Sequence, residues 1–168
     1  MRVEHYNGAG GYDFRRDFDG YHRDSSAWYH FIIVYDSAQG SEVDRIKFYR
    51  NGEAVGVDNT ANAMTQNFQS AFNSNETHWL GAINHSFDYD GYMAEVNFVD
   101  GQTLTPSDFG ETGDYGEWKP IEYEGTYGTN GFYLNFETAA DMGDDKSGNG
   151  NDFAEDNIAA TDQMVDSP

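Results

Sequence analysis

The stretch Asp90-Gly-Tyr-Met-Ala-Glu-Val-Asn-Phe-Val-Asp-Gly101 decides the fold class of this chain. Its side chains alternate across residues 92–99. One face carries Tyr92, Ala94, Val96 and Phe98, and the other carries Met93, Glu95, Asn97 and Val99. A period of two indicates a β-strand with one buried face and one mixed face. Turn dipeptides, Asp-Gly at both ends, bound the strand.

The residues that follow this strand predict one short helix near 105–110. Thr105 is a suitable N-cap, Pro106 suits the first helical position, and Asp108 places an acid in the first turn. Gly110 then ends the helix after one or two turns.

Upstream, residues 28–35 read Trp-Tyr-His-Phe-Ile-Ile-Val-Tyr. The run is apolar on both faces and rich in aromatic and β-branched residues, which predicts a central strand between two packed layers. Residues 45–49 alternate again, and Asn51-Gly52 is a typical hairpin turn because both positions tolerate positive φ. Residues 54–57 are therefore the expected return strand.

The rest of the chain adds short strands and loops. Strands are expected within 12–18, 78–83 and 131–136, and residues 117–120 and 122–127 are expected to be extended. Residues 58–76 are expected to form a long loop with one turn of helix, and an acidic loop with a disordered tail is expected after 138. Many short strands with almost no helix predict an antiparallel two-sheet β-sandwich or jelly roll, an all-β fold.

The composition limits the partners. The 168 residues include 30 acidic and 9 basic side chains, for a formal net charge of −21. Residues 100–168 hold 16 of the acids and only two of the bases. Such a surface repels nucleic-acid phosphates and anionic lipid head groups, so neither partner is expected. Acidity of this kind suits the binding of cations, or serves only solubility.

The sequence contains no cysteine, which excludes disulfides and thiolate metal sites. No apolar segment after Met1 is typical of a signal peptide, and no apolar run is long enough to cross a membrane. We therefore expect a soluble protein without membrane insertion.

A set of these motifs resembles one family. Trp28-Tyr-His-Phe, Ile46-Lys-Phe-Tyr-Arg-Asn-Gly52, Leu80-Gly81 and Phe87-Asp-Tyr-Asp-Gly-Tyr-Met-Ala-Glu-Val-Asn-Phe98 occur in that order. The set looks like the core of laminin-G-like members of the concanavalin A-like lectin/glucanase superfamily. The resemblance covers residues 26–110 and implies a jelly roll, with a core domain over residues 1–118. Residues 119–168 would be an acidic extension that adds the strand at 132–136.

Residues 100–111, 127–134 and 145–151 are similar to virion and tail-fibre-like proteins of marine bacteriophages. This similarity implies a structural, decoration or receptor-facing part, on a virion surface or outside the cell. Only 27 residues precede Trp28, where the family places several strands. The missing strands would come from a longer polypeptide, from residues 119–153 or from a neighbouring subunit. An incomplete sandwich exposes edges, so we expect a homo-oligomer, or contacts with other virion or cell-surface subunits.

Glucanases of this fold carry an acidic triad on one strand, and the comparable residues here are Glu95, Asn97 and Asp100. An amide replaces the middle acid, and on a regular strand Asp100 faces away from the other two. These departures favour a polar sheet face that meets a turn, so no enzymatic activity is expected.

A calcium site is the second candidate. Asp145-Lys-Ser-Gly-Asn149-Gly-Asn places oxygen ligands at alternate positions before a glycine, as in a calcium loop. Carboxylates that could complete the site are Asp141, Asp144, Asp88 and Asp90. The competing interpretation is an acidic turn that is stabilised by its own side chains.

Sugar binding is the third candidate. Tyr89, Tyr115 and Trp118 are loop aromatics that could stack on pyranose rings, or complete the core instead. His30 and His78 lie in predicted strands without zinc-like spacing. The sequence therefore predicts a non-enzymatic surface module, with calcium-assisted glycan binding or with assembly alone as its role.

Overall fold

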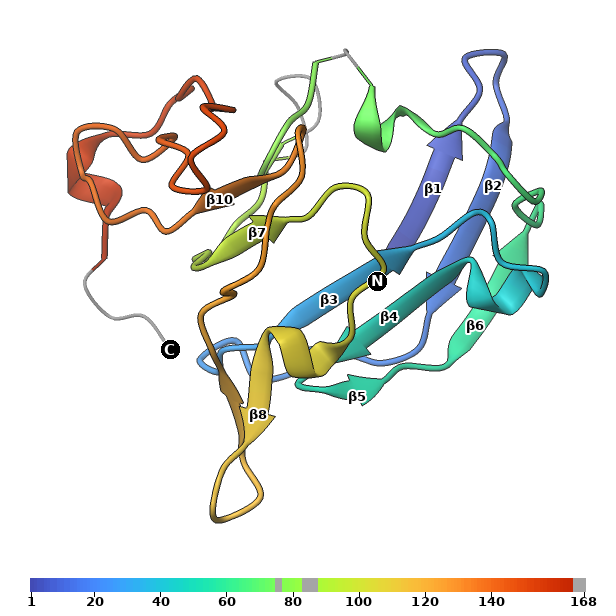
Figure 1. Ribbon diagram of the computed structural model, residues 1–168, viewed down its shortest axis with the longest axis horizontal. Coiled ribbons are helices and arrows are strands. Elements are labelled where there is room, and N and C mark those ends of the chain that lie inside the picture. The colour runs from blue at the N-terminus through green and yellow to red at the C-terminus, as the bar shows by residue number, and fades with distance from the viewer. Residues whose placement is uncertain (75–76, 83–87, 165–168) are drawn as a thin grey trace. The chain divides into compact units, whose positions relative to one another are not determined.

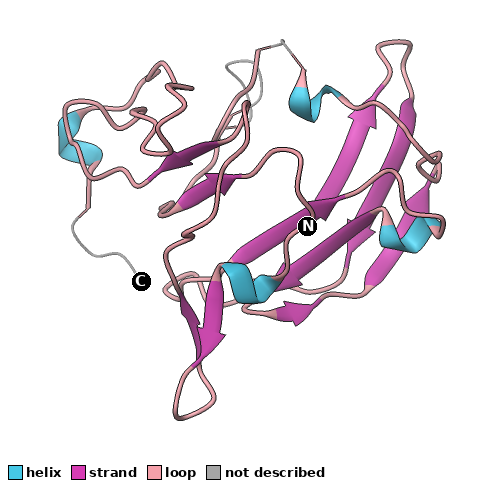
Figure 2. Ribbon diagram, in the orientation of Figure 1, coloured by secondary structure: helices cyan, strands magenta, loops and turns pink. Residues whose placement is uncertain are grey.

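The structure is a computed structural model that describes residues 1–74, 77–82 and 88–164. Its strands are β1 (Arg2–Tyr6), β2 (Tyr12–Phe18), β3 (Phe31–Tyr35), β4 (Ile46–Arg50), β5 (Glu53–Ala54), β6 (Val57–Ala61), β7 (Val96–Phe98), β8 (Gly110–Thr112), β9 (Trp118–Pro120) and β10 (Phe132–Leu134). Four single-turn 3₁₀ helices are η1 (Glu42–Asp44), η2 (Ala71–Asn73), η3 (Pro106–Asp108) and η4 (Ala160–Asp162). All strand pairings are antiparallel, so the predicted all-β class is confirmed (Figure 2). None of the helices in the described ranges has the length and apolar character that a membrane crossing requires.

The chain divides into two compact units. Unit 1 comprises Met1–Phe72 and Thr103–Glu124, and unit 2 comprises Asn73–Gln102 and Gly125–Pro168. The division predicted between residues 118 and 119 would fall inside β9, within unit 1.

Unit 1 contains two three-stranded sheets and a hairpin. The sheets have the orders β1-β2-β6 and β3-β4-β5, and β8 pairs with β9 (Figure 1). Asn51 and Gly52 form the predicted turn between β4 and β5, with φ of 49° and 79°. The return strand β5 is only two residues long, because the chain then crosses to the other sheet and β6 pairs with β2.

The two three-stranded sheets contribute side chains to one hydrophobic core. Its buried members are Val3, Phe14, Phe18, Ile46, Phe48 and Met64. On β2, Phe14 and Phe18 point inward by strand alternation, and Ile46 and Phe48 do so on β4. The rings of Phe18 and Phe48 lie 5.4 Å apart. Burial of each such side chain contributes about 1.5–3 kcal/mol to folding.

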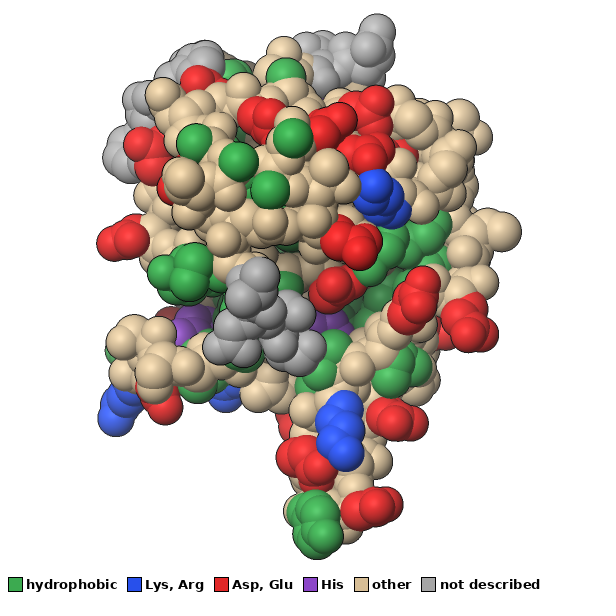
Figure 3. Space-filling model, turned by 90° about the vertical axis from the view of Figure 1, so that its left-hand side faces the viewer, with side chains coloured by type: hydrophobic (Ala, Val, Ile, Leu, Met, Phe, Trp, Pro, Cys, Tyr) green, Lys and Arg blue, Asp and Glu red, His purple; other side chains and the backbone are tan. Residues whose placement is uncertain are grey.

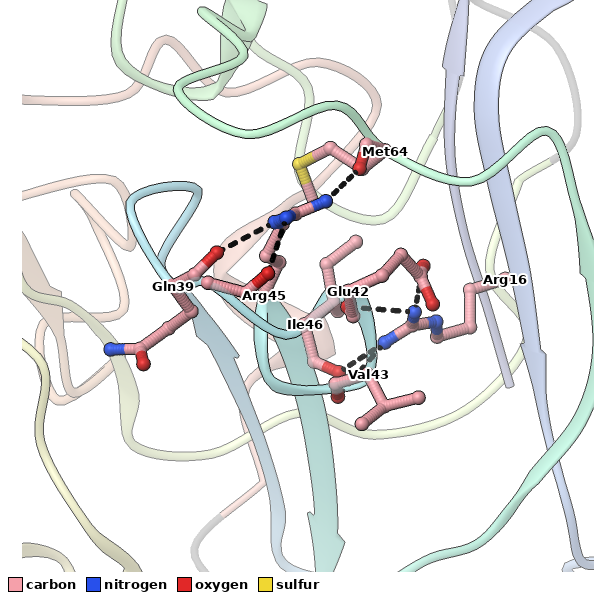
Figure 4. Close-up of polar contacts among 8 residues, drawn as sticks. Arg16, Gln39, Glu42, Val43, Arg45, Ile46 and Met64 are labelled. Atoms are coloured by element: carbon pink, nitrogen blue, oxygen red, sulfur yellow. Dashed lines mark hydrogen bonds and ion pairs between the residues drawn. The ribbon is translucent and has the colours of Figure 1, made fainter.

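Two buried arginines fasten the loop between β3 and β4 (Figure 4). Arg16 lies between Phe14 and Phe18 on β2 and is only 2% exposed. Its guanidinium donates to the carbonyls of Glu42, Val43 and Ile46 at 2.8–3.2 Å and pairs with the Glu42 carboxylate. Arg45 donates to the carbonyls of Gln39, Gly40 and Met64 at 2.5–2.9 Å. The buried charges are thus satisfied by hydrogen bonds, as burial requires.

Unit 2 contains one described pair of strands, β7 and β10. In this ladder Val96 is opposite Leu134, Asn97 is opposite Tyr133, and Phe98 is opposite Phe132. The stacked rings of Phe98 and Phe132 are 5.4 Å apart, and Leu134 is 1% exposed. One face of the pair is therefore apolar, and the other carries Asn97 and Tyr133.

Several predicted elements are shorter than expected. The strand predicted over 92–99 is only β7, because Glu95 has a φ of +53°, which does not fit a regular strand. Phe136 has a φ of +55° and lies beyond β10, so it does not extend that strand as predicted. The short helix is confirmed as η3, where the Asp108 carboxylate accepts from the Thr105 backbone N–H at 2.7 Å.

Two strand predictions are wrong in position. Residues 28–35 were expected in the centre of a sheet, but the strand begins at Phe31, and β3 lies at an edge of its sheet among the described strands. The strand expected over 78–83 is not formed by residues 78–82, and residue 83, like Phe87 of the family motif, lies outside the described ranges. Strands β1 and β8 were not predicted, and β6 lies mostly within the loop predicted over 58–76. The tail predicted to be disordered includes the turn η4, with residues 165–168 not described.

Candidate functional site

The loop at residues 145–151 of unit 2 is built around the Asp145 carboxylate, which is 7% exposed. This carboxylate accepts hydrogen bonds at 2.8–2.9 Å from the backbone N–H groups of Tyr133, Ser147 and Asn151 and from the Ser147 hydroxyl. Burial opposes ionisation, but these donors outweigh it and hold the pKa of Asp145 below its usual range. Asn149 turns its amide N–H groups to the carbonyls of Gly128 and Gly131.

This arrangement does not fit calcium. Both oxygens of Asp145 face N–H and O–H donors, where a cation would need free lone pairs. Asp144 pairs with Lys146 at 2.5 Å, and Asp141, Asp88 and Asp90 are exposed loop residues. Across the described ranges, no group of three or more His, Cys, Asp or Glu side chains is placed to hold a metal ion. The loop is organised by its own hydrogen bonds instead.

Substitution of Asp145 by asparagine is expected to lower the free energy of unfolding by about 1–3 kcal/mol, because one carboxylate oxygen becomes an amide N–H that faces donors. Addition of EDTA or of Ca²⁺ to the wild type is expected to leave the melting temperature unchanged. Thermal unfolding measured with and without each addition checks both results. A rise of several degrees with Ca²⁺ would instead restore the calcium interpretation of this loop.

The three residues that were compared with a glucanase triad each form side-chain hydrogen bonds within unit 2. The Glu95 carboxylate accepts from the Tyr133 hydroxyl, and the Asn97 amide oxygen accepts from the Tyr127 hydroxyl at 2.7 Å. The two tyrosine rings are nearly parallel, 6.1 Å apart. Asp100 accepts from Asn73 and Asn130. Glu95 and Asn97 thus share a hydrogen-bonded polar face, and Asp100 bonds to a different pair of side chains.

The three aromatics predicted to bind sugar do not form one platform. Tyr89 belongs to unit 2, where its hydroxyl donates to the Tyr92 carbonyl at 3.3 Å. Tyr115 and Trp118 belong to the β8–β9 hairpin of unit 1. Tyr115 is 96% exposed in its turn, and Trp118 packs so closely on Gly52 and Gly110 that neither position has room for a Cβ atom. Trp118 therefore attaches the hairpin to the β3-β4-β5 sheet.

Trp118 also forms a hydrogen bond with His30. Its Nε1 donates to the His30 Nδ1 at 2.7 Å, and the two rings are stacked 6.0 Å apart. The accepting Nδ1 cannot carry a proton, so His30 is neutral with its proton on Nε2. Burial lowers the pKa of His30 below its usual value, which also favours the neutral form.

The stability of the protein is expected to fall as the pH is lowered from about 7 to 5.5, because unfolded His30 titrates near 6.5 and the folded residue titrates lower. In this interval the unfolded state binds more protons. His22 contributes with the same sign, since partial desolvation of its ring against Tyr29 and Phe31 and then the Arg50 charge lower its pKa. Urea unfolding at several pH values in this range gives the free energy of unfolding as a function of pH. The slope of that free energy against pH should be smaller in His30→Gln than in the wild type and unchanged in Tyr115→Ala. An unchanged slope in His30→Gln would contradict this assignment.

An aromatic cluster in unit 1 was not identified from the sequence. We define the aromatic patch as His22, Tyr29 and Phe31. The Tyr29 and Phe31 rings are nearly parallel, 6.1 Å apart with an interplanar angle of 7°. The His22 ring lies edge-on to both, at 5.1 and 4.8 Å. Phe31 is 39% exposed, and His22 is also exposed.

The signal for this patch was present in the alternation of residues 29 and 31. It was assigned to a buried strand because the whole run 28–35 is apolar. Since β3 is an edge strand among those described, Phe31 and its neighbour on the same face, Ile33, keep 39% and 48% of their surface exposed. The edge position of β3 depends on how the other strands pair. For this reason residues that were predicted to lie in the core are partly on the surface.

Comparison with known proteins gives no match: no family model, no curated protein and no solved structure resembles the chain significantly.

Proposed function

We propose that the chain is a non-enzymatic surface module of laminin-G-like jelly-roll type that binds glycans through the aromatic patch. The patch is the observation that carries the proposal. Parallel, partly exposed rings at Tyr29 and Phe31 offer apolar faces for stacking on sugar rings, and the His22 imidazole adds a hydrogen-bonding group. The setting on a virion or cell surface rests on the resemblance of residues 100–111, 127–134 and 145–151.

Three features of the described residues support a sandwich module of this kind. Two antiparallel sheets share one core, β4 and β5 are joined by a two-residue turn, and the Asn97 side chain of β7 accepts a hydrogen bond. Binding at the aromatic patch does not require calcium, since the patch contains no carboxylate.

A glycan array tests this proposal. Wild type should give a saturable response that Phe31→Ala and His22→Ala each lower at least tenfold, because each substitution removes one wall of the aromatic patch. Tyr115→Ala is the matched control, as it removes a more exposed aromatic from the same unit. The melting temperature of each variant shows whether it is folded. Absence of any response, or a loss confined to Tyr115→Ala, would contradict glycan binding at the patch.

The second candidate is an assembly module without a sugar ligand. It is favoured by β3, a sheet edge in the described part of the chain, with exposed Phe31 and Ile33 beside open backbone groups. Light scattering would show a defined oligomer, and the array no response. A hydrolase would instead release reducing ends from a β-glucan, and Glu95→Gln would abolish that release.

A further inference from the structure

The distribution of charge indicates which ligand the aromatic patch binds. Acidic side chains are spread widely and basic ones are few on the face shown in Figure 3. Among the nine basic residues of the sequence, six have an acidic partner within 4 Å, namely Arg2, Arg15, Arg16, Lys47, Lys119 and Lys146. Arg45 is buried and donates to three carbonyls. Within the described ranges, only Arg23 and Arg50 have neither kind of partner.

One of these arginines, Arg50, lies beside the aromatic patch. Arg50 is directly opposite Phe31 in the β3–β4 ladder, so the two side chains leave the same face of the sheet. The Arg50 guanidinium passes so close to Gly20 that a Cβ there would lie 2.7 Å from its Nη1, and its charge acts on His22. Arg23 lies over the ring of Tyr21, 5.4 Å from its centroid, next to His22 in the sequence.

Arg50 therefore carries a positive charge without a carboxylate partner among the described residues, although the chain has 30 acidic residues. A half-buried guanidinium beside aromatic rings provides planar N–H donors that match a carboxylate or a sulfate, and such charged hydrogen bonds are about twice as strong as neutral ones. The rings accept the apolar face of a sugar. A neutral sugar would use the rings and leave the guanidinium unpaired.

We infer that the ligand of the aromatic patch is an acidic saccharide, whose carboxylate or sulfate pairs with Arg50 while its ring stacks on Phe31 and Tyr29. This inference rests on the proposed glycan binding and adds the charge of the ligand. Long-range repulsion from the net charge of −21 is screened beyond about 8 Å at 0.15 M salt, so contacts within the patch decide the affinity.

The test compares charged and neutral forms of one sugar backbone. Oligogalacturonate and its methyl ester differ only in the carboxylate, and a sulfated galactan oligosaccharide and its desulfated form differ only in the sulfate. Calorimetry at 0.15 M salt should show that wild type binds at least one charged form about tenfold or more tightly than its neutral counterpart. If the affinities differ between oligogalacturonate and its methyl ester, the recognised group is the carboxylate. If they differ between the sulfated and desulfated galactans, it is the sulfate.

Arg50→Gln should abolish that preference and retain weak binding of both forms. Lys47→Gln is the matched control: it removes a positive charge from the same strand, but Lys47 points to the opposite face and pairs with Asp44 at 3.2 Å. It should leave the preference intact. Unchanged melting temperatures would show that both variants are folded.

Three outcomes would overturn the inference. Equal binding of charged and neutral forms, unaffected by Arg50→Gln, would leave glycan binding in place and remove the acidic ligand. Binding of no sugar of either kind, on the array or by calorimetry, would contradict the proposed function itself. Self-association of the wild type that Arg50→Gln abolishes, without sugar binding, would identify the anion as a carboxylate of a second copy.

Discussion

Replacement of Arg16 by alanine is expected to lower the free energy of unfolding by about 3–5 kcal/mol, because it breaks a partly buried ion pair and removes the donors of three carbonyls. The Arg16 side chain is 2% exposed and bonds to Glu42, Val43 and Ile46. A domain of ordinary stability has only about 5–15 kcal/mol in total, so the variant would be close to its unfolding threshold.

Urea denaturation followed by tryptophan fluorescence measures this loss. Arg2→Ala is the control, because Arg2 forms an ion pair with Asp17 at 2.6 Å on the surface of β1, where solvent screens the pair and its loss should change stability little. Equal losses of unfolding free energy in the two variants would show that Arg16 does not form these buried hydrogen bonds with the β3–β4 loop.

Replacement of Phe48 by alanine is expected to cost about 3–5 kcal/mol, since it leaves a cavity at the centre of the unit 1 core. Phe48 is 1% exposed, and its ring lies 5.4 Å from Phe18 and 5.5 Å from Phe31. For a protein of this length, each kcal/mol lowers the melting temperature by about 2–4 °C, so a fall of roughly 10 °C is expected.

Ile33→Ala provides the comparison for Phe48→Ala. Ile33 is directly opposite Phe48 in the β3–β4 ladder and faces the same side of the sheet, yet it is 48% exposed. Its loss should cost under about 1.5 kcal/mol. Calorimetry of both variants would test whether the sheet face is buried at Phe48 and open at Ile33. A large loss of stability in Ile33→Ala would show that β3 is covered at Ile33.

Local features of the chain were predictable because they depend on a few neighbouring residues. The turn at Asn51-Gly52 follows from the tolerance of both residues for positive φ, and η3 follows from its cap and Pro106. Alternation in β4 and β10 identified these strands and their inward residues, whereas β2 was expected only as a short strand without assigned inward residues. The two positive-φ residues Glu95 and Phe136 limited two strands, and neither residue type signals that conformation.

The candidate site was not predictable in the same way. Tyr89, Tyr115 and Trp118 were chosen as loop aromatics, but Tyr89 belongs to unit 2 and the other two to unit 1. Tyr115 is almost fully exposed, whereas Trp118 packs against Gly52 and Gly110. The Asp145 loop has the ligand spacing of a calcium loop, and the same spacing serves to accept backbone N–H groups. Whether an oxygen faces a cation or a donor depends on where the surrounding chain, such as Tyr133, is placed.

The amino-acid sequence by itself determined the all-β class, the positions of most turns and the acidic character of the chain, since periodicity, turn chemistry and charge are local properties. Tertiary structure alone decided that β6 pairs with β2, that Arg16 is buried, and that Phe31 and Arg50 meet at a sheet edge. Strand pairing joins residues that are distant in the sequence, and the pairing sets which side chains remain uncovered.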